Sequence, residues 1–231
     1  MKNGRKGLEI LYEDDSIIVI DKPGGLLTMS TGKAEETTAY SILTDYVRSG
    51  RGSGDRRARD RRRIFIVHRL DRDTSGVIVF AKDPETKYAL QDDWNQIVLE
   101  RKYVAVLEGT PRLSEGTIAS YLKDNPKSMK VSSSRTDNGG RFSVTHFRVI
   151  RPGNYSLVEF ELETGRKNQI RVHAADIGHP VAGDRKYGAR TNPLHRLALH
   201  ARTISFRHPH TGKILTFDTG IPGRFLTLTR R

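Results

Sequence analysis

Three short polar segments of the chain carry side chains that could do chemistry. The densest, His68–Gly76, places two carboxylates, two arginines and two hydroxyls between apolar residues. A carboxylate such as Asp71 can act as a nucleophile or a base, and a nearby cation favours its charged form. A turn in which Asp73–Ser75 bond their own backbone explains the second half of the segment. It does not explain Arg69, Leu70 and Asp71.

The other two segments have simpler explanations beside the chemical one. In Thr164–His173 we expect a short helix with Arg171 one turn after Lys167, and a basic helix face that contacts solvent or RNA explains it equally well. Lys102–Val106 has the alternation of a strand, with Tyr103 on one face. A tyrosine there ordinarily belongs to a core or an interface.

Strands predominate among the elements that must position these segments. Runs of β-branched and aromatic residues, separated by Asn-Gly-Gly and Pro-Gly-Asn turns, predict a mainly antiparallel sheet and an α+β class. We expect one domain over residues 1–231, with two sub-halves of about 1–100 and 101–231. The strands that we expect are 10–13, 16–21, 64–67, 77–81, 102–107, 116–122, 141–150, 155–162, 197–206 and 213–219, and the helices are 35–47, 84–97 and 168–177.

A net charge of +13 over 231 residues must either face an anionic partner or be tolerated as self-repulsion. The charge is densest at Arg48–Arg63, which holds eight arginines and two aspartates among glycines and serines. No helix or strand period fits this stretch, so we expect a flexible Arg/Gly-rich loop at about 49–63. It is either a solvated surface loop or a phosphate contact, and the guanidinium fork favours phosphate.

Several classes of protein are disfavoured by what the sequence lacks. It has no cysteine, which excludes a disulfide scaffold, a thiolate nucleophile and cysteine-ligated zinc. It shows no P-loop, no dinucleotide-binding glycine motif and no paired histidines with zinc spacing. We see neither a secretory signal nor an apolar run long enough to span a membrane. We therefore expect a cytoplasmic protein.

The segment 68–76, followed by Ala81-Lys82, closely resembles the signature of RluA-type RNA pseudouridine synthases. Further motifs similar to that family extend from about residue 8 to residue 222. They are Asp21-Lys22-Pro23-x-Gly25, Lys102-Tyr103, Gly165-Arg166-x-x-Gln169-Ile170-Arg171-Val172-His173, Gly178-His179-Pro180-Val181-x-Gly183-Asp184, Tyr187-Gly188, Leu197-Ala198-Leu199-His200-Ala201 and Phe206-x-His208-Pro209. Many relatives have Thr-His where this chain has Lys167-Asn168. No separate S4-like RNA-binding domain is recognised.

The resemblance implies a mainly antiparallel mixed sheet flanked by helices and loops, with a central catalytic cleft. It implies an isomerase that converts uridine in structured ribosomal or transfer RNA to pseudouridine, without cofactor or metal. By resemblance Asp71 is the catalytic carboxylate, Arg171 its cationic partner, and Tyr103 stacks on the uracil with Leu197 beneath. Arg69 enters the space that the flipped uridine leaves. The attack of Asp71 on C1′, its addition to the ring and its removal of a sugar proton stay open.

The remaining residues that we assign to substrate or RNA contact are Lys22, His68, Thr74, Ser75, Arg166, Lys167 and Gln169. We expect a monomer. Two alternatives remain: a non-catalytic RNA-binding factor, which leaves Asp71 unexplained, and a glycosidase-like hydrolase. The hydrolase would use Asp71 and Asp73, about 6–7 Å apart in an extended segment.

Overall fold

The computed structural model describes residues 8–32, 36–49 and 63–230. Most of the Arg/Gly-rich loop, residues 50–62, lies outside them. The chain divides into two compact units, each described by itself. The first takes Met1–Leu99 and Ile204–Thr219, and the second takes Glu100–Thr203 and Gly220–Arg231. Residues 204–219, which we expected in the C-terminal half, thus belong to the first unit.

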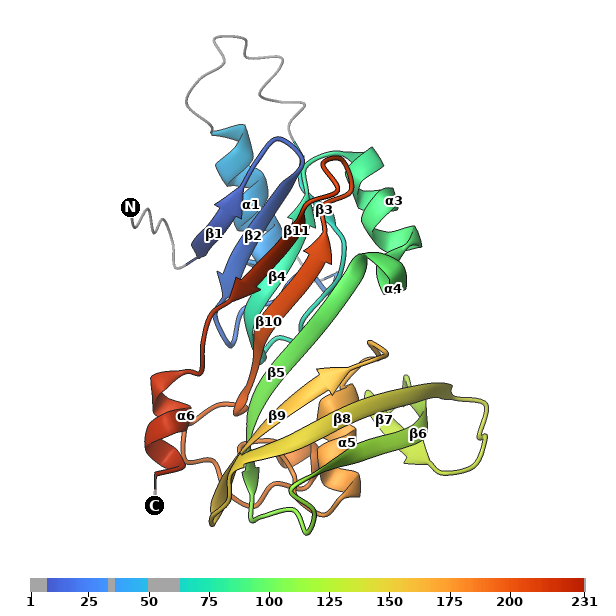
Figure 1. Cartoon of the computed structure of the whole chain (residues 1–231), viewed down its shortest axis with the longest axis vertical. Coiled ribbons are helices and arrows are strands. Elements are labelled where there is room, and N and C mark those ends of the chain that lie inside the picture. Colours follow the sequence, from blue (N-terminus) through green and yellow to red (C-terminus); the bar gives the residue numbers. More distant parts are fainter. Residues whose placement is uncertain (1–7, 33–35, 50–62, 231) are drawn as a thin grey trace. The chain divides into compact units, whose positions relative to one another are not determined.

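The first unit is built on a sheet in the order β1-β2-β4-β10, in which β3 pairs with β4 and β11 with β10 (Figure 1). Strand β4 is buried along its whole length, as its apolar run Val77–Ala81 predicts. The bounds of these strands are Glu9–Glu13 (β1), Ile17–Lys22 (β2), Phe65–Ile66 (β3), Ser75–Ala81 (β4), Leu199–Arg207 (β10, of which the part from Ile204 belongs here) and Ile214–Asp218 (β11).

Three helices accompany this sheet: α1 (Ala39–Arg48), α3 (Pro84–Asp92) and α4 (Trp94–Ile97). Helix α1 starts four residues later than expected because Thr38 caps it and accepts a hydrogen bond from the Ser41 amide. The single helix expected over 84–97 is wrong. It breaks at Asp93, where consecutive aspartates meet the negative end of the α3 dipole.

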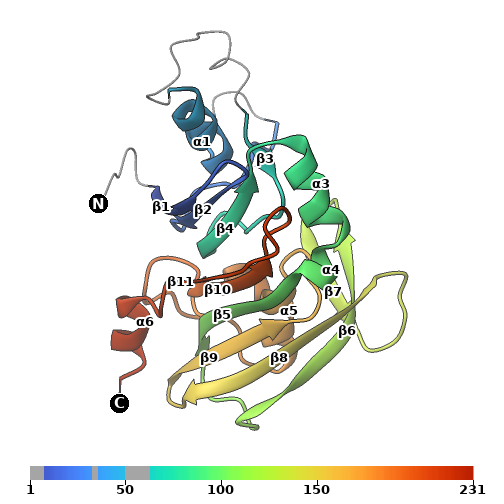
Figure 2. The same ribbon diagram turned by 45° about the horizontal axis from the view of Figure 1, so that its top comes forward.

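The second unit contains an antiparallel sheet in the order β5-β9-β8-β6-β7. Helix α5 covers one face of this sheet, where its apolar residues join the core of the unit (Figure 2). Strand β7, the short helix η1 and helix α6 were not expected from the sequence. The bounds are Val98–Glu108 (β5, of which the part from Glu100 belongs here), Glu115–Asn125 (β6), Lys130–Ser134 (β7), Arg141–Arg151 (β8), Tyr155–Leu162 (β9), Gln169–Asp176 (α5), Arg185–Tyr187 (η1) and Gly223–Leu228 (α6).

The elements that were missed have weak local patterns. Strand β7 reads Lys-Val-Ser-Ser-Ser and has one apolar residue, so its pairing with β6 defines it. Helix α6 begins at a glycine and is six residues long. Its Phe225 is buried, so packing of this ring stabilises a helix with little intrinsic preference.

Candidate active site

Asp71 lies in the loop that connects β3 to β4, in the first unit. The Thr74 amide donates to the Asp71 carbonyl at 3.2 Å, which closes a turn. The Asp71 residue itself is half-buried. Because Arg72 and Asp73 form this turn, the extended spacing on which the two-aspartate hydrolase depended is absent.

The residues on either side of Asp71 are held through their backbone. The Thr28 hydroxyl donates to the Leu70 carbonyl at 2.9 Å and accepts from the Leu70 amide at 3.3 Å. The Gly25 amide donates to the Arg72 carbonyl at 2.9 Å. The residues on either side of Asp71 are therefore tied by their carbonyls to the segment that follows β2.

Lys22 is the most unusual of these anchors, because it is fully buried. Its ammonium donates to the carbonyls of Pro23 at 3.0 Å, Leu26 at 2.7 Å and Arg72 at 3.1 Å. Three carbonyl acceptors match the three donors of an ammonium group. We assigned Lys22 to RNA contact, and in the structure it braces the Asp71 loop from inside.

The other expected residues of this loop differ in exposure. Arg69 is exposed, whereas Thr74 and Ser75 are buried. His68 accepts a hydrogen bond from the Val79 amide at Nε2, 3.0 Å away, and its ring lies 4.9 Å from that of Trp94.

In the second unit, Tyr103 lies on β5, opposite Phe160 of β9. Tyr103 is half-buried at the edge of the core, and Leu197 is buried in that core. Arg101, two residues before Tyr103 on the same face of β5, donates to the carbonyls of Leu162 and Glu163. Burial is the main reason why the pKa of Arg101 is lowered; Tyr103 opposes the shift and Arg166 adds to it.

Helix α5 is fixed at its start by Gln169. The side-chain oxygen accepts from the Thr164 hydroxyl and the Arg166 amide, and the side-chain nitrogen donates to the Val144 carbonyl and the Thr145 hydroxyl, all at 2.9 Å. Four bonds use the full capacity of an amide group. Gln169, which we assigned to RNA contact, thus lies where it orients α5.

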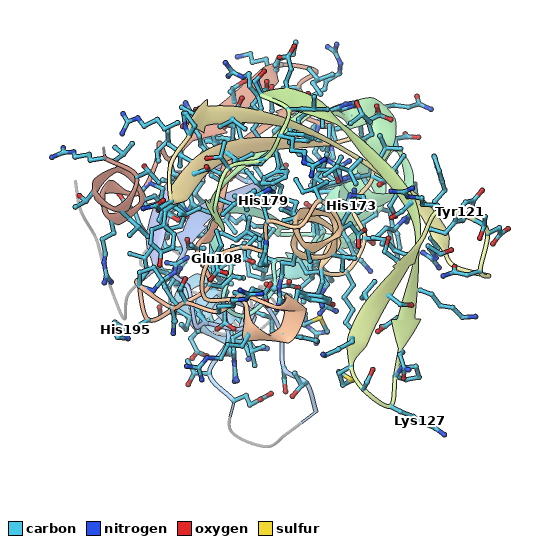
Figure 3. All side chains as sticks on the ribbon, turned by 90° about the horizontal axis from the view of Figure 1, so that it is seen from below. Glu108, Tyr121, Lys127, His173, His179 and His195 are labelled. Atoms are coloured by element: carbon cyan, nitrogen blue, oxygen red, sulfur yellow. The ribbon has the colours of Figure 1, made fainter. Side chains whose placement is uncertain are left out.

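His173 fixes the same helix one turn later; it is labelled in Figure 3, which is seen from below. Its Nε2 lies 3.0 Å from the Ser120 hydroxyl and its Nδ1 lies 2.8 Å from the Thr145 hydroxyl. Ser120 also accepts from Ser133 at 2.9 Å. Burial lowers the pKa of His173 from 6.5 to about 4. The ring is therefore neutral at neutral pH, with one nitrogen to donate and one to accept.

Arg171 projects from α5 into a polar enclosure. Its Nε and Nη2 donate to the two carboxylate oxygens of Asp184 at 2.6 and 2.8 Å, and its Nη1 donates to the Asn168 side-chain oxygen at 3.0 Å. The guanidinium carbon lies 5.1 Å from the centre of the Tyr187 ring. Asp184, Asn168 and Tyr187 support Arg171. None of the three was expected as a site residue, although Asp184 and Tyr187 lie in motifs that resemble the family.

The two basic residues before α5 lie nearer solvent. Arg166 is exposed, and Lys167 pairs with Asp124 of β6 at 2.7 and 2.9 Å. The expectation that Arg171 follows Lys167 by one helical turn is wrong, because α5 starts only at Gln169. Asn168 between them has a left-handed backbone, with a φ of 55°.

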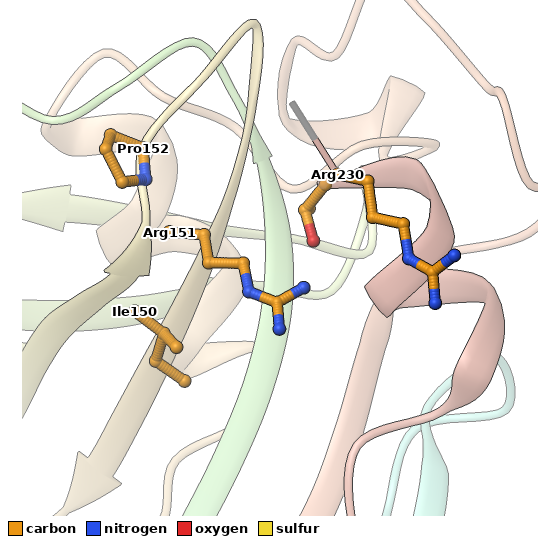
Figure 4. Close-up of a pocket in the computed structure, with 5 residues that line it drawn as sticks. Ile150, Arg151, Pro152 and Arg230 are labelled. Atoms are coloured by element: carbon orange, nitrogen blue, oxygen red, sulfur yellow. The ribbon is translucent and has the colours of Figure 1, made fainter.

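Two surface pockets of the second unit contain none of the expected site residues. One lies where β8 ends, next to α6, and Figure 4 labels four of its residues. The other lies over β6, β8 and β9 and is lined by three glutamates, Arg148 and His146, among others. Among the described residues, no group of three or more histidine or acidic side chains could hold a metal ion, and no helix is long and apolar enough to cross a membrane.

Comparisons with known proteins agree with the resemblance. Residues 16–176 match the family RNA pseudouridylate synthase. An RNA pseudouridine synthase of Bacillus subtilis (strain 168), YhcT, is 37% identical over 230 residues, covering 96% of this chain and 72% of that protein. Ribosomal large subunit pseudouridine synthase D of Zymomonas mobilis is 35% identical, covering 93% of this chain and 69% of that protein.

Two solved structures have a similar fold. Human RNA Pseudouridylate Synthase Domain Containing 4 superposes with a TM-score of 0.73 at 23% identity, over 94% of this chain and 90% of that one. Human RNA Pseudouridylate Synthase Domain Containing 1 superposes with a TM-score of 0.71 at 24% identity, over 96% and 87%. The expected fold class is confirmed.

Proposed function

The chain belongs to the RNA pseudouridylate synthase family, and we propose that it acts on structured ribosomal or transfer RNA with Asp71 as its catalytic carboxylate. As a member of that family it is an isomerase that converts uridine in RNA to pseudouridine. The observation that carries the proposal is the bracing of the Asp71 loop, in which Lys22 and Thr28 hold the carbonyls of the neighbouring residues.

The reaction itself defines what the site must supply. The bond from C1′ to N1 breaks, a bond from C1′ to C5 forms, C5 loses a proton and N1 gains one. Nothing is oxidised or reduced, so a carboxylate and a proton-transfer group are sufficient in principle. A fixed carboxylate is useful because a displacement of about 1 Å can reduce a rate about 100-fold. The backbone bonds at Leu70 and Arg72 provide such fixation.

In the proposal, Tyr103, Arg171 and Leu197 of the second unit also serve the isomerisation. Tyr103 stacks on the uracil and is the candidate for proton transfer at C5. Arg171 supplies the positive charge that the isomerisation uses. Leu197 is already buried in the core of the second unit, so the surface that it offers to a ring is rigid.

Arg69 is the proposed base-flipping residue. A uridine inside structured RNA must leave its stack before it can react, at a cost of a few kcal/mol. The exposed Arg69 lies two residues before Asp71, and its planar guanidinium can stack in the space that the base leaves. The positive charge of the chain supports binding of the RNA backbone.

The central experiment compares Asp71→Asn with Asp73→Asn, which removes an exposed carboxylate from the same turn. The substrate is unmodified ribosomal and transfer RNA transcript carrying tritium at uridine C5, so that isomerisation releases tritium to water. Asp71→Asn should release none while binding RNA within about threefold of wild type, and Asp73→Asn should stay active. An active Asp71→Asn enzyme would end the assignment. Free uracil would indicate a hydrolase, and unchanged RNA with the wild-type protein would indicate a binding factor.

Base flipping is tested with Arg69→Ala and, as its matched control, Arg72→Ala. The Arg72 side chain is exposed, and its ion pair with Glu36 is long, at 4.0 Å between Nη2 and Oε1. Arg69→Ala should slow the reaction on structured RNA at least about tenfold more than on an unstructured oligonucleotide. Equal losses on the two substrates would contradict flipping.

Tyr103→Phe separates stacking from proton transfer. The phenyl ring keeps the stacking surface, so RNA affinity should stay within about threefold while the single-turnover rate falls. A wild-type rate would show that the hydroxyl takes no part.

A further inference from the structure

We propose that Asp184 is the positioning residue for Arg171: it sets the orientation in which the guanidinium serves the isomerisation. The inference deepens the proposed function and rests on the role given there to Arg171. It concerns only contacts within the second unit. Asp184 itself is not proposed to contact the substrate.

The contact between the two side chains fixes a plane as well as a distance. Asp184 accepts from Nε and Nη2 of Arg171 at 2.6 and 2.8 Å, the fork geometry in which two parallel hydrogen bonds hold both groups coplanar. The Asp184 side chain is 1% exposed and that of Arg171 is 13% exposed. Water therefore competes little for the carboxylate, and rotation of the guanidinium would leave a buried charge without its cation.

Asp184 is itself rigidly placed. Its amide donates to the Val181 carbonyl at 2.9 Å, and its carbonyl accepts from the amides of Tyr187 and Ala189 at 3.0 Å each. Gly183, just before it, has a φ of +84°, and a Cβ there would lie 2.3 Å from the Arg196 carbonyl oxygen. The loop thus presents the carboxylate from a backbone that does not depend on Arg171.

Two further residues complete the enclosure. The Asn168 side chain accepts from Nη1 of Arg171 and donates to the Tyr187 hydroxyl at 2.9 Å. That hydroxyl also accepts from the Val131 amide at 3.0 Å. Asn168 reaches Arg171 from a left-handed backbone position that asparagine tolerates better than most residues. Three N–H groups of Arg171 are thereby directed by side chains of the second unit.

Stability alone is a poor reason for this arrangement. A buried ion pair often stabilises a fold no better than apolar residues of the same size, because both charges lose their hydration. A flexible arginine that must act at one place gains directly from a rigid partner, since a displacement of about 1 Å can lower a rate about 100-fold. The buried fork is therefore better explained by orientation than by stability.

The test is a double-mutant cycle on the single-turnover rate of tritium release, with saturating enzyme and the labelled RNA transcripts. Asp184→Asn, Arg171→Met and the double variant are compared below the melting temperature of each. Asp184→Asn should lower the rate about 10- to 100-fold with RNA affinity within about threefold of wild type. The double variant should be no more than about threefold slower than Arg171→Met alone, because Asp184 acts only through Arg171.

Two more variants serve as a control and as an independent test of the enclosure. Glu159→Gln removes a carboxylate that pairs with Arg148 and Arg202 on the sheet, and it should keep the wild-type rate. Asn168→Gly keeps the left-handed backbone but removes the contact with Arg171. It should lower the rate in the wild-type background and not in the Arg171→Met background, which tests the enclosure even if Asp184→Asn folds poorly.

The possible failures are distinguishable. A wild-type rate for Asp184→Asn beside a slow Arg171→Met overturns the inference and leaves the proposed function intact. Rate losses that multiply in the double variant show that Asp184 acts independently of Arg171, which also overturns it. A wild-type rate for Arg171→Met removes the role of Arg171 from the proposed function, and the inference falls with it.

Discussion

Acid should weaken the anchorage of α5, because His173 is buried as a neutral ring. Its pKa is about 4 in the folded chain and 6.5 as an ordinary histidine. Between these values the unfolded chain binds more protons than the folded one, so stability is lost as the pH falls from about 6.5 towards 4. The contribution of His173 is fully present above that window.

The magnitude follows from the size of the shift. A difference of about 2.5 pKa units corresponds to about 3 kcal/mol once both states are protonated. Between pH 7 and pH 5 the loss should be about 2 kcal/mol. For a chain of this length that lowers the melting temperature by about 4–8 °C.

The assay isolates His173 by substitution. Asp14 and Glu108, whose pKa values are lowered mainly by hydrogen bonds against the opposing effect of burial, become protonated only below pH 5. The comparison is therefore between wild type and His173→Gln, in urea unfolding at pH 7 and pH 5. Glutamine cannot titrate, so the stability advantage of wild type should shrink by about 2 kcal/mol between the two.

A matched control is His195→Asn, because His195 is exposed and its φ of 55° suits asparagine. This variant should follow wild type in parallel at both pH values. If His173→Gln also ran parallel to wild type, the buried neutral ring would not be the source of the acid sensitivity and the reasoning would be refuted.

Three further substitutions test how the site is braced. Lys22→Met leaves three carbonyls without their donor, so it should lower the free energy of unfolding in urea by about 2–4 kcal/mol and slow the single-turnover reaction. A variant as stable as wild type would contradict the bracing of the Asp71 loop. Thr28→Val should lower the free energy of unfolding by about 1 kcal/mol and lower the single-turnover rate, whereas Thr28→Ser, which keeps the hydroxyl, should preserve both. Equal effects of the two substitutions would show that the hydroxyl plays no part. Gly183→Ala should lower the free energy of unfolding by about 3 kcal/mol or more in thermal unfolding, whereas Gly212→Ala, where a Cβ meets open space, should lower it by about 1 kcal/mol. Similar losses in the two variants would refute the close approach of Gly183 to the Arg196 carbonyl.

Local pattern was sufficient wherever neighbouring residues decide the structure. The alternation of β9 predicts its bounds, Tyr155–Leu162, and the apolar run of β4 predicts a buried strand. The signature around Asp71 indicated the family by resemblance, and the family match over residues 16–176 confirms it. Where Thr38 caps α1 or Asp93 interrupts a helix, the local signal was present but weaker than the apolar periodicity.

The sequence by itself therefore determined the family and the α+β class, and it predicted which residues react. The tertiary structure decided which partners hold them. Lys22 and Arg72 are 50 positions apart, and Arg171 and Asp184 are 13 apart with a helix end and a loop between them. The pKa of His173 depends on burial, which periodicity does not measure. The physical reason is that hydrogen-bond geometry and desolvation arise only when distant segments pack together, whereas strand and helix preference act along the chain.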